Sequence, residues 1–457
     1  MTSSFRDPSG FVFSHNRSVY RQINDVYKKD YELLLKSGLY KALSEKGYLV
    51  KHEEVMLKDY QATSDAWKII HPQQIPFISY PYERCFSMLK DAALLTLEIQ
   101  KTALEHNMSL KDASAFNIQF LEGKPILIDT LSFEAYNEGK PWIAYKQFVE
   151  HFLAPLYVMN MNGVALNRIT SVFLDGIPIE VAASMLPFKA RLNISLFIHI
   201  FAHAASQKKY STKKLGKTLD AKSFSRGSLL GMINDLERLI KKIEWDPKGT
   251  QWEAYYEEEN NNYNDVSFRH KAELVKNYLT EVKPKTIWDM GANTGHFSRI
   301  GVDVGANVMA FDIDYGALEK NYRDVVKSKE KKLLPLFCDL TNPTPATGWE
   351  NKERLSLFQR GPADAVLALA LIHHLAIPHN VPFSYLASCF SQLGNYLVVE
   401  FIDKTDSQVQ ILLANRKDIF SEYSKEHFEK AFADFFTIRH AVAIKGSKRI
   451  LYLMEKK

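Results

Sequence analysis

The stretch Lys285-Thr-Ile-Trp-Asp-Met-Gly-Ala-Asn-Thr-Gly-His-Phe297 decides the fold of the C-terminal part of this chain. Its first half is apolar and carries an acid, Asp289, near its end, as a buried strand would. Gly291 and Gly295 can take backbone angles that other residues avoid, and without a Cβ they let a ligand approach the main chain. A helix that begins near Thr294 would offer unpaired N–H groups at the same place. The stretch therefore predicts a strand, a tight turn and a helix that together cradle a nucleotide.

Two further segments have the pattern of buried strands that end in an acid. Residues 307–312 end in Asp312, at the place where a strand–helix–strand unit puts a carboxylate on ribose hydroxyls. Residues 333–340 end in Asp339 and Leu340. No Gly-Lys-Ser/Thr follows the glycines, and the full Gly-x-Gly-x-x-Gly pattern is missing, so neither a phosphate loop nor a standard NAD site fits the sequence.

A fourth apolar segment, residues 363–370, runs into Leu-Ile-His-His-Leu. In this order and at this spacing, the four segments resemble class I S-adenosylmethionine-dependent methyltransferases over residues 265–457. The resemblance implies an α/β domain with a Rossmann-like, seven-stranded sheet. The remaining strands of that sheet are expected at residues 396–401, 436–444 and 449–454.

The resemblance also assigns residues to the cofactor S-adenosylmethionine. The glycine turn and its acid would surround the amino-acid end, Asp312 would accept both ribose hydroxyls, and Asp339 with the Leu340 N–H would meet the adenine. The sulfonium is already an activated electrophile, so the protein mainly has to bind it, aim the methyl group and exclude water. The expected cofactor-binding residues are Asp289, Gly291, Asn293, Gly295, Asp312, Asp339 and Leu340.

Candidate residues for catalysis and for the acceptor follow the fourth and fifth strands. His373 and His374 come at the strand end, where ligands of open α/β sheets bind. Either could be the base for a hydroxyl acceptor, with His373 preferred, or could instead shape the pocket or pack beneath it. Glu400 and Asp403 are placed to line the acceptor pocket, and the alternative for both is a solvated loop charge.

Two segments refine the resemblance. Residues 339–349, which include two prolines, and residues 353–364 resemble a bacterial subgroup that includes nodulation-associated methyltransferases. This subgroup implies transfer to a small molecule or a glycan. The identity of the acceptor and its reacting atom cannot be read from these residues.

Composition restricts the remaining function classes. Lys plus Arg total 58 and Asp plus Glu 53 in 457 residues, and this net charge of +5 favours neither nucleic-acid nor membrane binding. The apolar runs are too short to cross a bilayer, so no membrane insertion is expected. Cys85, Cys338 and Cys389 show no CxxC spacing, which excludes a disulfide framework and fits a cytoplasmic protein. His199 and His203 lie four apart without an evident third ligand, so no metal site is expected.

The N-terminal part, residues 1–205, has a mixed α+β pattern that is mostly helical. Its periodicity predicts a hairpin, then a helix, three strands and a long helix, followed by further helices. These elements are expected at residues 8–24, 27–47, 50–57, 67–70, 75–80, 86–106 and 145–205.

Part of this region resembles kinase-like folds over about residues 8–200. Asp112 precedes Asn117 by five residues, and Asp129 follows a predicted hairpin. In true phosphotransferases the first Asp orients the substrate hydroxyl, while the Asn and the second Asp hold magnesium. The sequence lacks the Gly-rich loop, and Lys68 is only a possible strand lysine. The alternative is that Asp112 and Asn117 close a loop while Asp129 ends a strand.

A basic linker with lid helices, residues 206–264, would join the N-terminal region to the methyltransferase domain at residues 265–457. Six lysines lie between Lys208 and Lys222, and the segment at Trp252 would form a lid over the cofactor. The favoured function is methyl transfer with the N-terminal region assisting acceptor binding. The alternatives are a bifunctional kinase-like methyltransferase, an RNA methyltransferase that uses the lysines, and a noncatalytic protein with a degenerate pocket.

Overall fold

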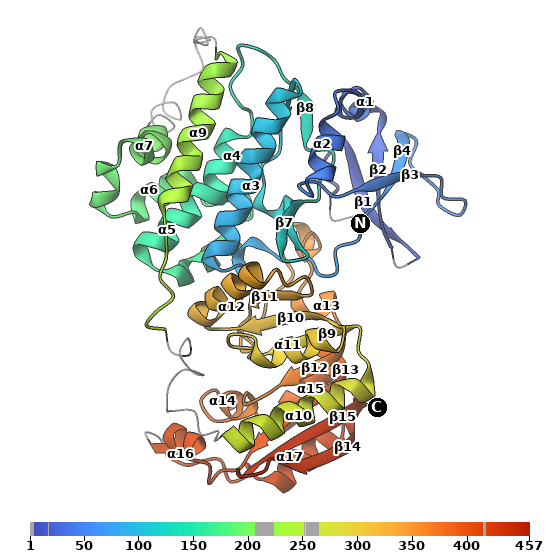
Figure 1. Cartoon of the computed structure of the whole chain (residues 1–457), viewed down its shortest axis with the longest axis vertical. Coiled ribbons are helices and arrows are strands. Elements are labelled where there is room, and N and C mark those ends of the chain that lie inside the picture. The colour runs from blue at the N-terminus through green and yellow to red at the C-terminus, as the bar shows by residue number, and fades with distance from the viewer. Residues whose placement is uncertain (1–3, 17, 206–223, 251, 253–264, 415–416) are drawn as a thin grey trace. The chain divides into compact units, whose positions relative to one another are not determined.

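The computed structural model describes residues 4–16, 18–205, 224–250, 252, 265–414 and 417–457. The chain divides into two compact units (Figure 1). Unit 1 comprises Met1–Asp246 with Thr347–Arg354, and unit 2 comprises Pro247–Ala346 with Leu355–Lys457. Among the described residues, no helix is long and apolar enough to cross a membrane. The lysine-rich segment 208–222 and most of the predicted lid lie outside the described residues.

Unit 1 begins with a four-stranded antiparallel sheet in the order β1-β2-β4-β3. The predicted hairpin over residues 8–24 is confirmed, because β1 pairs with β2 from Gly10 opposite Ile23 to His15 opposite Ser18. The helix predicted over residues 27–47 is interrupted at Gly38, which takes a left-handed φ of 82°. The elements are β1 (Gly10–His15), β2 (Ser18–Asn24), η1 (Asp25–Tyr27), α1 (Lys28–Lys36), α2 (Leu39–Glu45), β3 (His52–Val55) and β4 (Ala66–Pro72).

The strand predicted over residues 75–80 is wrong. Pro76 cannot donate to a sheet ladder. The Ser79 N–H instead donates to the Gln119 side chain at 2.8 Å, and the Gln119 amide donates back to the Ser79 carbonyl at 2.9 Å. A buried side-chain amide thus replaces the neighbouring strand that the sequence pattern implied.

The rest of unit 1 packs around the long helix α3 (Phe86–Glu105), as predicted for residues 86–106. Helix α9 (Arg226–Lys242) lies along α3, and Lys101 pairs with Glu237 at 2.8 Å (Figure 1). The other strands are β5 (Met108–Leu110), β6 (Ile118–Leu121), β7 (Lys124–Leu127) and β8 (Phe133–Ala135). The other helical elements are η2 (Pro81–Glu83), η3 (Ala115–Asn117), α4 (Tyr145–Phe148), η4 (Val149–Leu153), α5 (Ala154–Asn162), η5 (Val164–Ser171), α6 (Ile179–Met185), η6 (Phe188–Leu192), α7 (Ile194–Leu196), η7 (Phe197–Ala202) and, from the later segment, η8 (Trp349–Asn351).

Unit 2 contains the seven-stranded sheet that the sequence predicted, in the order β11-β10-β9-β12-β13-β15-β14. The first five strands of this order are parallel, whereas β15 is antiparallel to both of its neighbours. The strand order reverses direction between β9 and β12, so the carboxyl ends of these two strands flank a crevice. The strands are β9 (Thr286–Met290), β10 (Asn307–Asp312), β11 (Leu333–Phe337), β12 (Ala363–Ala368), β13 (Gly394–Ile402), β14 (Phe436–Ala443) and β15 (Arg449–Lys456).

Helices cover this sheet and complete its core. Helix α10 buries Val275, Tyr278 and Leu279 against the sheet residues Ile287 and Leu453. The buried strands read as continuous apolar runs because parallel strands are covered on both faces. The helices are α10 (Asp265–Val282), α11 (His296–Asp303), α12 (Tyr315–Ser328), α13 (Leu357–Arg360), α14 (Ile372–Ala376), α15 (Phe383–Leu393), α16 (Ser407–Ala414) and α17 (Lys425–Ala433).

Candidate cofactor and acceptor site

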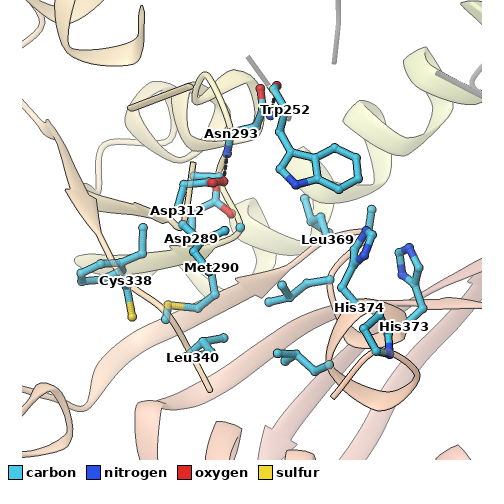
Figure 2. Close-up of a pocket in the computed structure, with 18 of the residues that line it drawn as sticks. Trp252, Asp289, Met290, Asn293, Asp312, Cys338, Leu340, Leu369, His373 and His374 are labelled. Atoms are coloured by element: carbon cyan, nitrogen blue, oxygen red, sulfur yellow. Dashed lines mark hydrogen bonds between the residues drawn. The ribbon is translucent and has the colours of Figure 1, made fainter. Parts of the chain in front are cut away.

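A cavity of about 540 Å³ lies at the carboxyl ends of the central strands of unit 2 (Figure 2). Its wall combines the ends of β9, β10 and β12 with the loops that follow them, and α16 contributes one further side. This volume is in the range of pockets that enclose small ligands. Eight of the predicted site residues line the cavity, namely Asp289, Gly291, Asn293, Asp312, Asp339, Leu340, His373 and His374.

The glycine turn has the backbone conformation that its sequence requires. Gly291 and Gly295 have φ angles of 80° and 81°, and Asn293 adopts a φ of 52°. The N–H groups of Gly291 and Ala292 both donate to the Phe311 carbonyl, at 2.8 and 2.9 Å, which ties the turn to β10. Gly295 does not line the cavity. It shapes the turn instead, because a Cβ at this position would come within 2.6 Å of the Asn321 amide.

Two buried carboxyl groups face the cavity beside this turn. Asp312 accepts the Asn293 N–H at 2.6 Å and the Asp314 N–H at 2.8 Å, one on each oxygen (Figure 2). Burial raises the pKa of Asp312 to about 6 despite these bonds. Burial also raises the pKa of Asp289 to about 7, while a 2.6 Å hydrogen bond from the Ser298 hydroxyl opposes the rise. Each Asp312 oxygen has a further lone pair for a ligand hydroxyl.

Trp252 lines the cavity and is held there by two hydrogen bonds. The Trp252 N–H donates to Asp314 at 2.9 Å, and the Asn293 amide donates to the Trp252 carbonyl at 2.8 Å. The Trp252 ring meets His374 edge-on, with 5.2 Å between ring centroids (Figure 2). Of the predicted lid, this residue is described and lines the cavity.

His373 and His374 lie together after β12, with ring centroids 4.1 Å apart. Burial lowers the pKa of His373 well below its ordinary value and that of His374 to about 4. Both rings are therefore neutral near pH 7. The Nδ1 atom of His373 is buried and has no hydrogen-bond partner among the described residues. A buried polar atom without a partner is costly, and this nitrogen is enclosed by the protein although the His373 ring borders the cavity.

A buried network of charges forms the floor of the cavity. Lys271 pairs with Glu400 at 2.7 Å, and Arg449 lies 3.5 Å from the other Glu400 oxygen and 3.0 Å from Asp406. Glu400 also accepts the Ala370 N–H at 2.9 Å, in the loop that leads to His373. Lys271 and Arg449 line the cavity, whereas Glu400 is fully buried and does not. Glu400 thus sits behind the wall, unlike its expected position in the acceptor pocket.

Asp403 also does not line the cavity. Its carboxylate accepts the N–H and the hydroxyl of Thr405, at 2.8 and 2.7 Å, and these bonds lower its pKa. Lys271, Ile313 and Arg449 line the cavity but were not among the residues predicted from the sequence. Ile313 directly follows Asp312 and could have been found from that position. No local signal marks Lys271 or Arg449, since both belong to segments far from the glycine turn.

The three kinase-like residues lie in unit 1 near its first sheet. The predicted hairpin before Asp129 is present as β6 and β7. Asp129 pairs with Arg21 at 2.8 Å and accepts the Ser132 hydroxyl at 2.6 Å. Asp112 accepts the Ser114 N–H at 2.9 Å and the Gln147 amide at 2.8 Å, and burial together with Asp129 raises its pKa. Protein groups thus already bind both acids.

Comparison with known proteins shows a sequence relative over the whole chain and structural neighbours over less than half of it. No family model matches it. The nodulation protein NoeA of Rhizobium meliloti (strain 1021) is 34% identical over 463 residues, which span 100% of this chain and 96% of the relative. Among solved structures, magnesium protoporphyrin IX methyltransferase (ChlM) from Synechocystis PCC 6803 with bound SAH is 16% identical, with a TM-score of 0.31 over 42% of this chain and 84% of that chain. The PH0226 protein from Pyrococcus horikoshii OT3 is 18% identical, with a TM-score of 0.31 over 44% of this chain and 98% of that chain. At 34% identity over its full length, the chain belongs to the family of the nodulation protein NoeA.

Proposed function

We propose that this protein is an S-adenosylmethionine-dependent methyltransferase whose unit 2 transfers a methyl group to a small molecule or a glycan. One observation carries the proposal: the cavity joins the glycine turn after β9 to the buried Asp312 at the end of β10. A ligand with a ribose and an amino-acid end has hydroxyl and ammonium donors, and carboxylates are the acceptors that such donors need.

The cofactor would be held by residues from consecutive strand ends. Asp312 would accept the ribose hydroxyls with the lone pairs that Asn293 and Asp314 leave open. The turn at Gly291 would approach the amino-acid end, and Asp339 with Leu340 would border the adenine. When bound, S-adenosylmethionine supplies a methyl group that is already activated by its sulfonium.

The chain's own residues would position the acceptor and receive its proton. His373 lines the cavity beside His374, and its ring would orient an acceptor hydroxyl for attack. Its lowered pKa keeps the ring neutral near pH 7, and the same shift makes it a weaker base than an exposed histidine. Trp252 and the apolar side chains Ile411 and Leu412 of α16 would exclude water from this end.

Unit 1 would assist by binding or presenting the acceptor. We do not place phosphoryl transfer there, because Arg21 and Ser132 already bind the Asp129 carboxylate that would have to hold magnesium. RNA methylation rested on the lysines between Lys208 and Lys222, which lie outside the described residues.

A calorimetric titration of the full-length protein with S-adenosylhomocysteine tests the proposal. The parent should bind, and Asp312→Ala should bind about tenfold to a hundredfold more weakly, since a hydrogen bond to a charged group contributes about 1.5 to 3 kcal/mol. Asp303→Ala, which removes an exposed acid from α11, is the matched control and should bind like the parent. Absence of binding by a folded parent protein would refute the cofactor assignment.

A further inference from the structure

A group of large apolar side chains lies exposed on unit 1 between Phe188 and Ile198. This 188–198 surface spans η6, α7 and the start of η7, at the end of unit 1 where α6 and α7 are drawn beside α9 (Figure 1). Isolated exposed apolar residues are common in monomeric proteins, but a contiguous group marks an interaction site. The exposed fractions are Phe188 75%, Leu192 74%, Ile194 78%, Phe197 43% and Ile198 55%.

The same segment is firmly anchored, so this exposure is not the result of a loose chain end. Ala190, Leu196 and Ile200 are fully buried in the core of unit 1. The Asn193 side chain caps α7 by accepting the Leu196 N–H at 3.1 Å, and the Ser195 hydroxyl donates to Asp235 of α9 at 2.9 Å. Some apolar residues of the segment are thus buried in the core, and the others are exposed to solvent.

The neighbouring helix α6 carries an exposed acid, Glu180, but both charged residues of the 188–198 surface are basic. These residues, Lys189 and Arg191, are exposed. The acid that α9 presents to α7, Asp235, is bound by Arg238, His199 and Ser195. Apolar side chains beside exposed cations complement a layer of anionic headgroups over hydrocarbon.

We propose that the 188–198 surface docks this protein on an anionic lipid membrane. Phe188, Leu192 and Ile194 enter the headgroup region, and Lys189 with Arg191 binds the lipid phosphates. A protein partner fits less well, because lysine is depleted at protein–protein interfaces and enriched in membrane-surface segments. Docking requires no membrane-spanning helix, and it is independent of the activity proposed for unit 2.

Co-sedimentation of the full-length protein with phosphatidylcholine vesicles, with and without phosphatidylglycerol, tests this proposal. The parent should bind the anionic vesicles and lose binding as salt rises. The triple variant Phe188→Ser/Leu192→Ser/Ile194→Ser should bind at least about tenfold more weakly, since each side chain contributes buried apolar area. Lys189→Glu/Arg191→Glu should weaken binding by about tenfold or more, because each basic residue near an anionic membrane strengthens binding about fivefold.

The matched control is Met56→Ser/Val172→Ser/Ile419→Ser, which removes three exposed apolar side chains elsewhere and should bind like the parent. Unchanged circular dichroism would show that each variant is folded. Failure of the parent to bind anionic vesicles at low salt, or equal binding by the Phe188 triple variant, would overturn the proposal. So would a parent dimer in light scattering that this triple variant converts to a monomer, because the surface would then join two copies of the chain.

Discussion

The buried position of Asp312 predicts that cofactor affinity falls in mild acid. Its pKa of about 6 means that lowering the pH protonates it while ordinary aspartates remain ionised. A protonated carboxyl keeps fewer acceptor sites for ribose hydroxyls. At pH 5 about one molecule in eleven would carry the ionised form, and the apparent affinity falls by that fraction, about tenfold or 1.4 kcal/mol. At pH 7.5 the group is almost fully ionised and nothing is lost.

Titration calorimetry with S-adenosylhomocysteine at pH 7.5, 6 and 5 measures this loss. Asp312→Asn removes the titrating group and should bind weakly at pH 7.5, with a smaller further decline in acid. Asp289 titrates in the same window, with a pKa of about 7, so Asp289→Asn separates the two contributions.

The titration of Asp312 and Asp289 does not itself destabilise the folded protein in acid. Both folded pKa values lie above the unfolded value, so the folded state binds more protons between about pH 4 and 7. Their contribution to the free energy of unfolding therefore rises as the pH falls through this window. A parent affinity that stays constant from pH 7.5 to 5, in protein with unchanged circular dichroism, would refute the role given to Asp312.

Three further predictions follow from the same site. Lys271→Met should lower the free energy of unfolding in urea by about 1.5–3 kcal/mol, because buried Glu400 loses its 2.7 Å partner and keeps Arg449 at 3.5 Å. Lys271→Met/Glu400→Gln should recover part of this loss, and a single variant as stable as the parent would contradict the pairing. Gly295→Ala should lower the free energy of unfolding by about 1 kcal/mol or more in the same assay. The φ of Gly295 is 81°, and a Cβ at this position would meet Asn321, so an unchanged stability would show that the turn relaxes. His373→Ala should lower kcat for methyl transfer about 10²- to 10⁴-fold if His373 is the base, and a rate within about threefold of the parent would defeat that role.

Local patterns in the sequence predicted the glycine turn, the acid of β10 and the two histidines after β12. Each lies within one strand and the loop that follows it, so neighbouring residues suffice to place it at the carboxyl edge of the sheet. Glu400 was predicted to line the acceptor pocket, and its buried position could not be read from the neighbouring residues. Its partners come from α10 and β15, and a strand-end acid cannot be assigned to a pocket or to a buried ion pair until those elements are in position.

In unit 1 the strand predicted over residues 75–80 failed for the same reason. Residues 75–80 alternate like a strand, but the Gln119 side chain occupies the hydrogen-bonding groups that a neighbouring strand would need. Asp112 and Asp129 have the spacing of a kinase-like core, yet the sequence does not reveal that Arg21, from β2, binds Asp129. The position of a buried acid along its strand can be read from the sequence. The groups that bind it come from other elements, so they are known only from the tertiary structure.

The net charge of the whole chain does not describe the charge of the 188–198 surface. The whole chain carries +5, but both charged residues of the 188–198 surface, Lys189 and Arg191, are basic. Attraction to a headgroup layer decays within a Debye length of about 8 to 10 Å, so a membrane senses the charge of the face that it meets and little of the far side. A protein can therefore be nearly neutral overall and still bind an anionic surface. The exposed apolar side chains at Phe188, Leu192 and Ile194 are what distinguish this basic segment from an ordinary solvated linker.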